Sequence, residues 1–145
     1  MPRPGNIAVT TTHVHPITIY YEDTDFTGYV YHANYLKFFE RAREHLLGVE
    51  RLARMYRETG VGFVVYKAEL TFKEPAVHGD NLEIRTVGRA ESDYRCVFDH
   101  QVWKVGGAQP IVTGQVQMVA VDKVGKLVLL PEDVLGWLRS GTGPR

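Results

Sequence analysis

The stretch YYEDTDFTGYVYHANYLKFFERARE, residues 20–44, joins the end of a predicted strand to an amphipathic helix through an acidic turn. The turn contains Gly28, and the Asp and Thr residues before it supply local hydrogen bonds. One carboxylate, Asp25, one imidazole, His32, and one helix N-terminus therefore come within a few residues of each other. We expect the rest of the chain to act as a scaffold around this group.

The composition is that of an ordinary globular domain, with 145 residues, of which 44% are hydrophobic and 23% charged. The 17 basic and 17 acidic residues cancel, which argues against a nucleic-acid partner. No apolar run approaches the roughly 18 residues of a membrane span, and prolines near the N-terminus interrupt any signal-peptide core. The single cysteine, Cys96, has no partner for an internal disulfide, so we expect a cytoplasmic protein.

The first half of the chain predicts a strand followed by two helices. Residues 1–13 are expected to form a flexible lead-in, and residues 14–22 a strand, because apolar and polar residues alternate there. A helical stripe begins near Ala33 and comprises Tyr35, Phe39, Ala42, Leu46 and Val49. The other faces of this helix carry Lys37, Arg41, Arg43 and Glu44. Gly48 is expected to end the helix, and a shorter one is predicted over residues 50–58.

The second half predicts mostly strands. These are expected over residues 61–73, 81–87, 94–105 and 111–121, and Pro131 opens a short last helix. The order indicates one α+β domain over residues 14–140, in which the long helix covers one face of a five-stranded antiparallel sheet. Residues 141–145 are expected to form a tail. The last long strand is apolar on both faces, with Val112, Val116, Met118 and Ala120 on one and Ile111, Val119 and Val121 on the other. We therefore expect a second subunit to cover the outer face.

Asp25 is the first candidate for a chemical role. A carboxylate in this turn can attack a carbonyl carbon as a nucleophile, or take a proton from water as a general base. From position alone, a turn-forming or capping role is the commoner one, because turns are rich in aspartate. Glu22 and Asp23 end the predicted strand and are expected to be solvated.

His32 stands at the expected helix entrance, where it can orient Asp25 or a substrate, or serve as a cap or core residue. The backbone N–H groups from about His32 to Tyr35 are free donors, suited to an oxyanion that develops on a carbonyl group. Tyr21 either directs its hydroxyl toward Asp25 or the substrate, or packs as a core aromatic residue. Together these groups suit the cleavage of an acyl bond.

Other chemistries find little support in the sequence. The six histidines show no spacing typical of a metal site, and Cys96 lies in an alternating strand as a small buried residue would. No P-loop, G-x-S-x-G or G-x-G-x-x-G pattern occurs, so nucleotide hydrolysis, serine-hydrolase chemistry and dinucleotide binding are not indicated. We expect neither a metal nor a cofactor.

Residues 20–44 resemble the opening of the YbgC-like acyl-CoA thioesterases, relatives of 4-hydroxybenzoyl-CoA thioesterase. The pattern D-x-D-x-x-G-x-V-Y-H-x-N-Y-L-x-F-x-E-x-A-R runs from Asp23 to Arg43, and weaker similarity continues through residues 63–84 and the later strands. The resemblance implies a hotdog fold, which is a curved five-stranded antiparallel sheet wrapped around one long helix. It also implies a homo-oligomer, dimer or tetramer, with its sites at a subunit interface.

The resemblance further implies roles for individual residues. Asp25 matches the catalytic carboxylate of the family, His32 the motif histidine, and Tyr21 a tyrosine linked to activity. In the hydroxybenzoyl enzyme the backbone N–H at the position of His32 polarises the thioester carbonyl. The acyl group is expected in an apolar slot between subunits, with Val64 and Val65 among the residues that bind it.

Arg89 and Arg95 fall in the region where the hydroxybenzoyl enzyme binds the CoA nucleotide, although Asp93 between them is expected to oppose a phosphate.

The implied reaction is hydrolysis of an acyl-CoA to a carboxylic acid and free CoA, with an acyl carrier protein as a second possible carrier. Two alternatives remain open. One is a non-catalytic module that binds acyl-CoA or acyl carrier protein, and the other is a hydratase that acts on a double bond.

Overall fold

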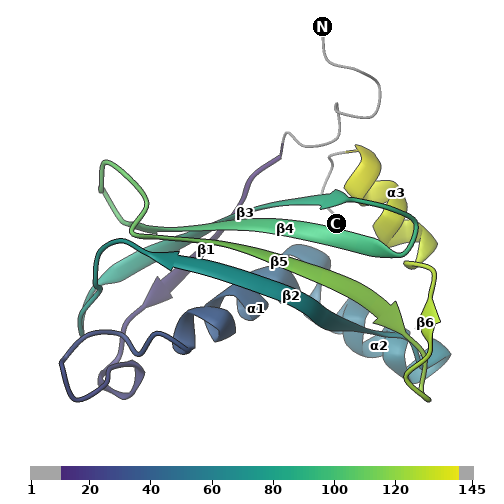
Figure 1. The fold of residues 1–145 in the computed structure, drawn as a ribbon, viewed down its shortest axis with the longest axis horizontal. Coiled ribbons are helices and arrows are strands. Elements are labelled where there is room, and N and C mark those ends of the chain that lie inside the picture. Colours follow the sequence, from purple (N-terminus) through teal and green to yellow (C-terminus); the bar gives the residue numbers. More distant parts are fainter. Residues whose placement is uncertain (1–10, 141–145) are drawn as a thin grey trace, which may run out of the picture.

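The computed structural model describes residues 11–140, which form one sheet and three α-helices (Figure 1). The helices are α1 Asn34–Leu47, α2 Val49–Thr59 and α3 Glu132–Ser140. The strands are β1 His13–Thr18, β2 Gly62–Phe72, β3 Asn81–Ala90, β4 Arg95–Lys104, β5 Val112–Val121 and β6 Leu127–Val128. Most of the expected lead-in, residues 1–10, and the expected tail, residues 141–145, lie outside the described residues.

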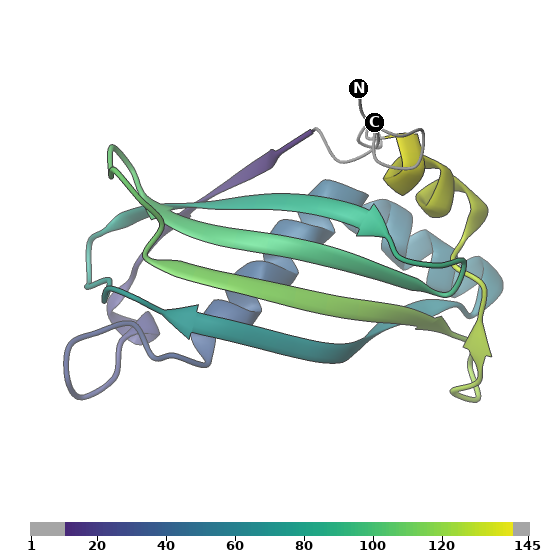
Figure 2. The ribbon, with the colours of Figure 1, turned by 45° about the horizontal axis from the view of Figure 1, so that its top comes forward.

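The strands pair antiparallel in the order β1-β3-β4-β5-β2, so that the predicted α+β hotdog fold is confirmed. The sheet curves across α1, which lies against one face of it (Figures 1 and 2). The sequence did not predict β6, a two-residue strand that pairs with the end of β5. β2 is an edge strand. β5 pairs with one side of it, and no described strand pairs with its other side.

The apolar stripe of α1 forms the centre of the core. Its buried residues include four that the helical period predicted: Tyr35, Phe39, Ala42 and Leu46. Phe39 stacks on the ring of His100, with 4.4 Å between the ring centroids. Gly114 makes this approach possible, because a Cβ at that position would lie 2.6 Å from Cε2 of Phe39. The helix is therefore held against the sheet by close aromatic packing.

Two residues of the predicted helix are placed differently. The prediction that Arg43 lies on an outer face is wrong, because its side chain is only 5% exposed and its Nη1 donates a hydrogen bond to Nε2 of His100 at 3.2 Å. Since arginine only donates, the proton of His100 is on Nδ1, which lies 2.8 Å from Oγ1 of Thr86. Val49 does not continue the stripe. Gly48 ends α1 with a φ of +99°, and Val49 begins α2 with an exposed side chain.

The first strand ends earlier than the alternation predicted. β1 stops at Thr18, and Tyr21–Asp23 form a short 3-10 turn. Oδ2 of Asp23 accepts a hydrogen bond from the N–H of Tyr20 at 2.8 Å, which closes that turn. Asp23 is therefore a structural residue of the turn and not merely a solvated one.

The outer face of the sheet is more polar than predicted. Val119 and Val121 are half-buried there, but Ile111 belongs to the core instead. Neighbouring side chains on this face form ion pairs and hydrogen bonds, which are Arg89 with Asp99, Gln115 with Asp99, and Lys67 with Glu69. This network pairs these polar groups within one chain, whereas Nε of Arg95 on the same face is buried without a hydrogen-bond partner, and the cover by a second subunit stays a prediction.

α3 packs against the C-terminal half of β3, at the end of the sheet that β1 does not reach (Figure 2). Val134 and Leu138 are its buried residues. Pro131 directly precedes the helix, as predicted. Within residues 11–140, no helix has both the length and the apolar character that crossing a membrane would need.

Three histidines meet where β1 packs on α1. The rings of His15 and His45 are stacked, with 4.6 Å between their centroids, and His13 lies one strand period away on the same face. Burial lowers the pKa of both strand histidines from 6.5, and the electrostatic interaction of each with His45 lowers it further. The charge of Arg41 adds to the effect on His15. Each strand histidine is therefore held in its neutral form.

The lowered pKa values predict a loss of stability in acid. Because an unfolded chain protonates these histidines more readily, the stability that they contribute is present above about pH 6.5 and is lost as the pH falls below it. Thermal melts between pH 7 and pH 5 are expected to show a smaller drop for His15→Gln than for the wild type. His78→Gln, at an exposed position, serves as the control. Equal slopes for His15→Gln and the wild type would contradict this account.

Gly114→Ala tests the packing of α1 on the sheet, and Gly136→Ala in α3 is its control. Gly114→Ala places a Cβ against Phe39 and is expected to lower the free energy of unfolding by about 1–3 kcal/mol. Gly136 lies exposed in α3 with open space around it, so Gly136→Ala is expected to raise the free energy of unfolding by up to about 1 kcal/mol. Urea unfolding of both variants measures the difference. A neutral Gly114→Ala would show that Phe39 does not depend on this close approach.

Candidate active site

The acidic turn folds into a compact loop that begins at Asp25. The N–H of Asp25 donates to the carbonyl of Tyr29 at 2.9 Å, and the N–H of Gly28 donates to the carbonyl of Asp25 at 3.0 Å. Gly28 has a φ of +85°, in the left-handed region that favours glycine. Tyr29 also forms a bridge with Val77, which ties the loop to the segment before β3. The backbone of the loop is therefore fixed at both ends.

Thr27 holds the side chain of Asp25. Oδ1 of Asp25 accepts hydrogen bonds from the backbone N–H of Thr27 at 2.8 Å and from its hydroxyl at 2.5 Å. These bonds, that of the hydroxyl first, lower the pKa of Asp25 from its ordinary 3.8, and the nearby His32 acts in the same direction. Asp25 is therefore ionised at neutral pH. Oδ2 has no hydrogen-bond partner within residues 11–140.

The entrance of α1 carries two free backbone donors. The N–H groups of Asn34 and Tyr35 donate to the carbonyls of Tyr31 and His32, which closes the first turn. The N–H groups of His32 and Ala33 have no acceptor among the described residues. The expected row of free donors from His32 to Tyr35 thus narrows to two adjacent groups at the positive end of the helix dipole.

Asp25 and His32 line the same cleft, as the sequence predicted. The cleft has a volume of about 300 Å³ and lies between the loop, the start of α1 and the end of β2. Its lining includes Asp25, Thr27, Tyr29, His32, Tyr35 and Phe72. The ring of His32 lies 4.7 Å from that of Tyr31 and 6.2 Å from that of Phe72. An ionised carboxylate and an imidazole therefore line an opening with an aromatic wall, and the two free backbone donors lie at the helix entrance beside it.

Tyr21, the third residue expected in the site, lies elsewhere. Its side chain is 79% exposed, and its ring packs edge-on against His78 at 6.0 Å. It does not line the cleft of Asp25. The early end of β1 explains this position, because Tyr21 stands in the 3-10 turn and not in the strand. A role for Tyr21 in activity remains a prediction.

Val64 and Val65 lie on the edge strand β2, and both side chains are exposed. The two valines are consecutive in the strand and therefore point to opposite faces of the sheet, and a bulge at Tyr66 interrupts the pairing of β2 with β5 after them. Val65 faces the helical side, where it lines a second cavity beside α1 and α2. Within one chain, neither valine lines the cleft of Asp25.

Arg89 and Arg95 occupy β3 and β4 near the loop that joins them. Arg89 forms an ion pair with Asp99, and the guanidinium of Arg95 lies over the ring of Tyr66 at 5.6 Å. Neither residue lines the cleft of Asp25.

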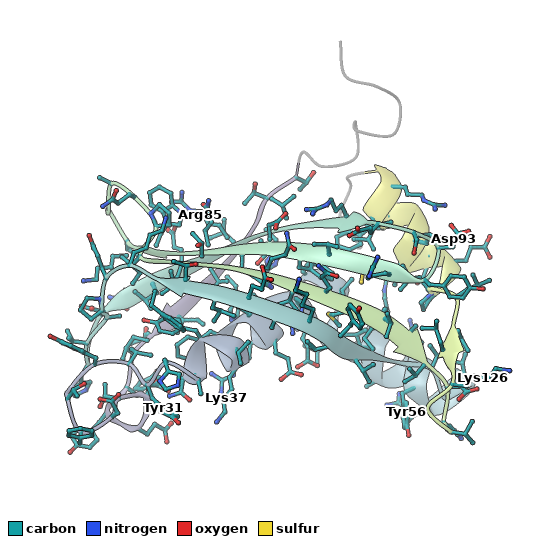
Figure 3. All side chains as sticks on the ribbon, in the orientation of Figure 1. Tyr31, Lys37, Tyr56, Arg85, Asp93 and Lys126 are labelled. Carbon is teal, nitrogen blue, oxygen red and sulfur yellow. The ribbon has the colours of Figure 1, made fainter. Side chains whose placement is uncertain are left out.

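The sequence expected Asp93 to oppose a phosphate near these arginines. Asp93 instead accepts a hydrogen bond from Arg139 of α3 at 2.5 Å, so its charge is already paired. Figure 3 labels Asp93 at one end of the molecule and Tyr31, the neighbour of His32, at the other. The expected CoA-binding residues and the expected catalytic residues of one chain therefore lie at opposite ends.

Thr27 and Phe72 line the cleft although the sequence did not predict them as site residues. Thr27 follows Asp25 in an Asp-x-Thr pattern, which is a local signal for a side chain that binds the backbone two residues on. Phe72 has no such signal, because only the pairing of β2 brings it to the cleft. No group of three or more His, Cys, Asp or Glu side chains within residues 11–140 is arranged to hold a metal ion.

The hydrogen bond from Thr27 predicts a measurable shift. Thr27→Val removes the hydroxyl donor and keeps the backbone donor, so the pKa of Asp25 is expected to rise toward its ordinary value. Thr27→Ser keeps a hydroxyl and is expected to leave the pKa low. A carbon-detected NMR titration of the Asp25 carboxyl group measures both variants. Identical titrations of Thr27→Val and the wild type would exclude the hydroxyl as the cause.

The cleft can be compared with known proteins. The family model of the thioesterase-like superfamily matches residues 20–138. The acyl-CoA thioester hydrolase YbgC of Escherichia coli O6:H1 is 42% identical over 78 residues, which are 53% of this chain and 58% of that protein. The acyl-CoA thioesterase YbgC of Helicobacter pylori is 48% identical over 68 residues, 47% of this chain and 50% of that protein. The chain thus spans little more than half the length of these curated relatives.

Longer matches cover nearly the whole domain. The acyl-CoA thioesterase YbgC of Haemophilus influenzae is 31% identical over 121 residues, 82% of this chain and 88% of that protein. A probable thioesterase from Bartonella henselae has a crystal structure with a TM-score of 0.75 and 32% identity, covering 83% of this chain and all of that one. A 1,4-dihydroxy-2-naphthoyl-CoA thioesterase from Synechocystis shares the fold, with a TM-score of 0.81, 24% identity, and coverage of 88% and 96%. The chain therefore belongs to the thioesterase-like superfamily, among its YbgC-like members.

Proposed function

We propose that the protein is an acyl-CoA thioesterase, which hydrolyses a thioester to a carboxylic acid and free CoA. One observation supports this most directly: the ionised Asp25 lines a cleft at the entrance of α1, where two backbone N–H groups are free. The names of the YbgC relatives support an acyl-CoA as the substrate. The acyl carrier protein is a second carrier of the same thioester chemistry.

In the proposed reaction, the carbonyl oxygen of the thioester accepts hydrogen bonds from the N–H groups of His32 and Ala33. Asp25 then takes a proton from water as the water oxygen bonds to the carbonyl carbon. The negative charge moves to the carbonyl oxygen, where the two donors and the helix dipole stabilise it. When the carbon–sulfur bond breaks, the thiolate takes the proton from Asp25, which returns to its ionised form, and acid and thiol leave.

A covalent route uses the same groups. Oδ2 of Asp25, which no described residue engages, attacks the carbonyl carbon, expels the thiolate and forms a mixed anhydride that water then hydrolyses. His32 lines the cleft beside Asp25 and orients the thioester in either route. Single-turnover hydrolysis in ¹⁸O-water separates the two routes, since attack of water on the Asp25 carbonyl of the anhydride leaves the label in Asp25.

We further propose that two copies pair through β2. This strand is an open edge of 11 residues, and a second copy can extend the sheet by pairing antiparallel with it. Pairing about the middle of the strand sets Gly62 of one copy opposite Phe72 of the other. Val65 of one copy then lies near the cleft of the other on the helical side of the sheet, which agrees with its expected part in binding the acyl group, whereas Val64 faces the outer side.

The same pairing supports the expected role of Arg89 and Arg95. Arg95 lies over Tyr66, in the half of β2 that would approach the cleft of a second copy. Its guanidinium and that of Arg89 are therefore proposed to bind phosphate groups of a CoA held by the other copy. A tetramer would in addition need contacts across the polar outer face. A cytoplasmic location is proposed because the thiol of Cys96 is single and buried.

Asp25→Asn tests the proposed function. The amide neither takes a proton nor attacks a carbonyl, so kcat on a panel of acyl-CoAs is expected to fall by at least about 100-fold. Glu22→Gln changes an exposed carboxylate three residues away and is expected to leave kcat unchanged. Unchanged turnover in Asp25→Asn would remove Asp25 from its role. Tight binding of acyl-CoA by the wild type without turnover would favour the binding module.

A further inference from the structure

A second cavity lies at the other end of α1. It has a volume of about 270 Å³ and is enclosed by α1, α2 and the start of β2. Most of its wall is apolar and includes Leu47, Leu52, Met55, Phe63, Val65 and Met118. Arg43, Glu40 and Glu44 are the charged residues of its lining. The cavity thus combines an apolar wall with a charged wall, as ligand sites with a few placed polar groups do.

Arg43 is the unusual member of this wall. Its side chain is 5% exposed, and its Nη1 donates to His100. Its Nε is sealed from solvent without a hydrogen-bond partner, and its Nη2 forms no hydrogen bond or ion pair within residues 11–140, so that Nη2 is the donor available to the cavity. A buried guanidinium with unused donors is costly unless a ligand or water satisfies it. The cavity beside it provides the space for such an acceptor.

The charges around the cavity decide which acceptor fits. Glu40 and Glu44 line it together with Arg43, so the formal charge of the lining is −1. A carboxylate would be attracted by one residue and repelled by two. A hydroxyl group can accept from Arg43 and donate to one of the two glutamates, and it carries no charge. An apolar chain that ends in a hydroxyl group therefore matches this wall.

The position of the cavity relates it to the thioester. Gly62, Phe63 and Val65 of β2 line the cavity, whereas Phe72 at the other end of β2 lines the cleft of Asp25. In the paired edge strands described above, the start of β2 in one copy lies opposite Phe72 of the other. The cavity of each copy then adjoins the cleft of the other. An acyl group bound at Asp25 would extend into it.

We propose that this cavity holds the far end of the acyl group, and that Arg43 selects acyl chains with a terminal hydroxyl group. The proposal rests on the thioesterase function and on the pairing through β2. It adds a binding subsite and a specificity-determining residue that the cleft of Asp25 does not contain.

A matched pair of substrates tests the selection. For the wild type, kcat/KM is expected to be at least about tenfold higher for ω-hydroxydecanoyl-CoA than for decanoyl-CoA. For Arg43→Met this ratio is expected to fall to about one. Arg41→Met, which changes an exposed arginine of the same helix, is expected to keep the ratio of the wild type. Absence of turnover with every thioester would overturn the thioesterase function, whereas turnover with a wild-type ratio near one would overturn only the role of Arg43.

A heterodimer tests the arrangement between copies. Asp25→Asn and Arg43→Met copies with different tags are mixed, and the heterodimer is purified. If each site combines Asp25 of one copy with the cavity of the other, one site has both residues intact and the ratio returns to that of the wild type. A heterodimer with a ratio near one would show that cavity and cleft act within one copy, and would overturn the proposed arrangement.

Discussion

The packing of Phe39 on His100 and over Gly114 sets the position of α1 against the sheet. The ring has room only because Gly114 lacks a side chain and because His100 presents a flat face at 4.4 Å. The placement of the free donors depends on this contact, since they lie directly before the N-terminus of α1. The cleft and the second cavity lie at opposite ends of the same helix. A shift of the helix would therefore displace both.

The loop before α1 keeps the carboxylate of Asp25 ionised and accessible at the helix entrance. Thr27 engages one oxygen of Asp25 through two hydrogen bonds and leaves the other oxygen without a partner within residues 11–140. Asp23 closes the preceding turn, and Asn34 donates its side-chain amide to the carbonyl of Asp23 at 2.9 Å. The two aspartates of the motif thus have different tasks, one in the fold and one facing the cleft.

The buried polar side chains of the core are Arg43, Thr86 and His100 among the described residues. Around Phe39 the packing is tight, and the only polar partners are Arg43, His100 and Thr86, which form one hydrogen-bonded chain among the described residues. Burial lowers the pKa of both Arg43 and His100. A guanidinium beside a neutral imidazole, without an ion pair among residues 11–140, is unfavourable for stability alone. Its place on the wall of a cavity gives it a use in binding.

The sequence alone was sufficient to predict the elements and the placement of Asp25 and His32 in one cleft. Helical period, glycine positions and strand alternation predicted α1, α2, α3 and the five long strands, because these signals are local in the chain. The motif around Asp25 and His32 predicted that they share a site, since seven residues separate them. The end of β1 was misjudged, because the hydrogen bond of Asp23 competes with strand alternation there.

Other features depended on contacts between distant residues, and only the tertiary structure decided them. The burial of Arg43 follows from His100, which lies 57 residues away, and the period of the helix cannot show whether a charged side chain has such a partner. The placement of Phe72 at the cleft, of Arg89 and Arg95 away from it, and of the polar network on the outer face also depends on residues that are distant in the sequence. Local patterns determine which elements form, whereas the pairing of strands distant in sequence determines which side chains meet.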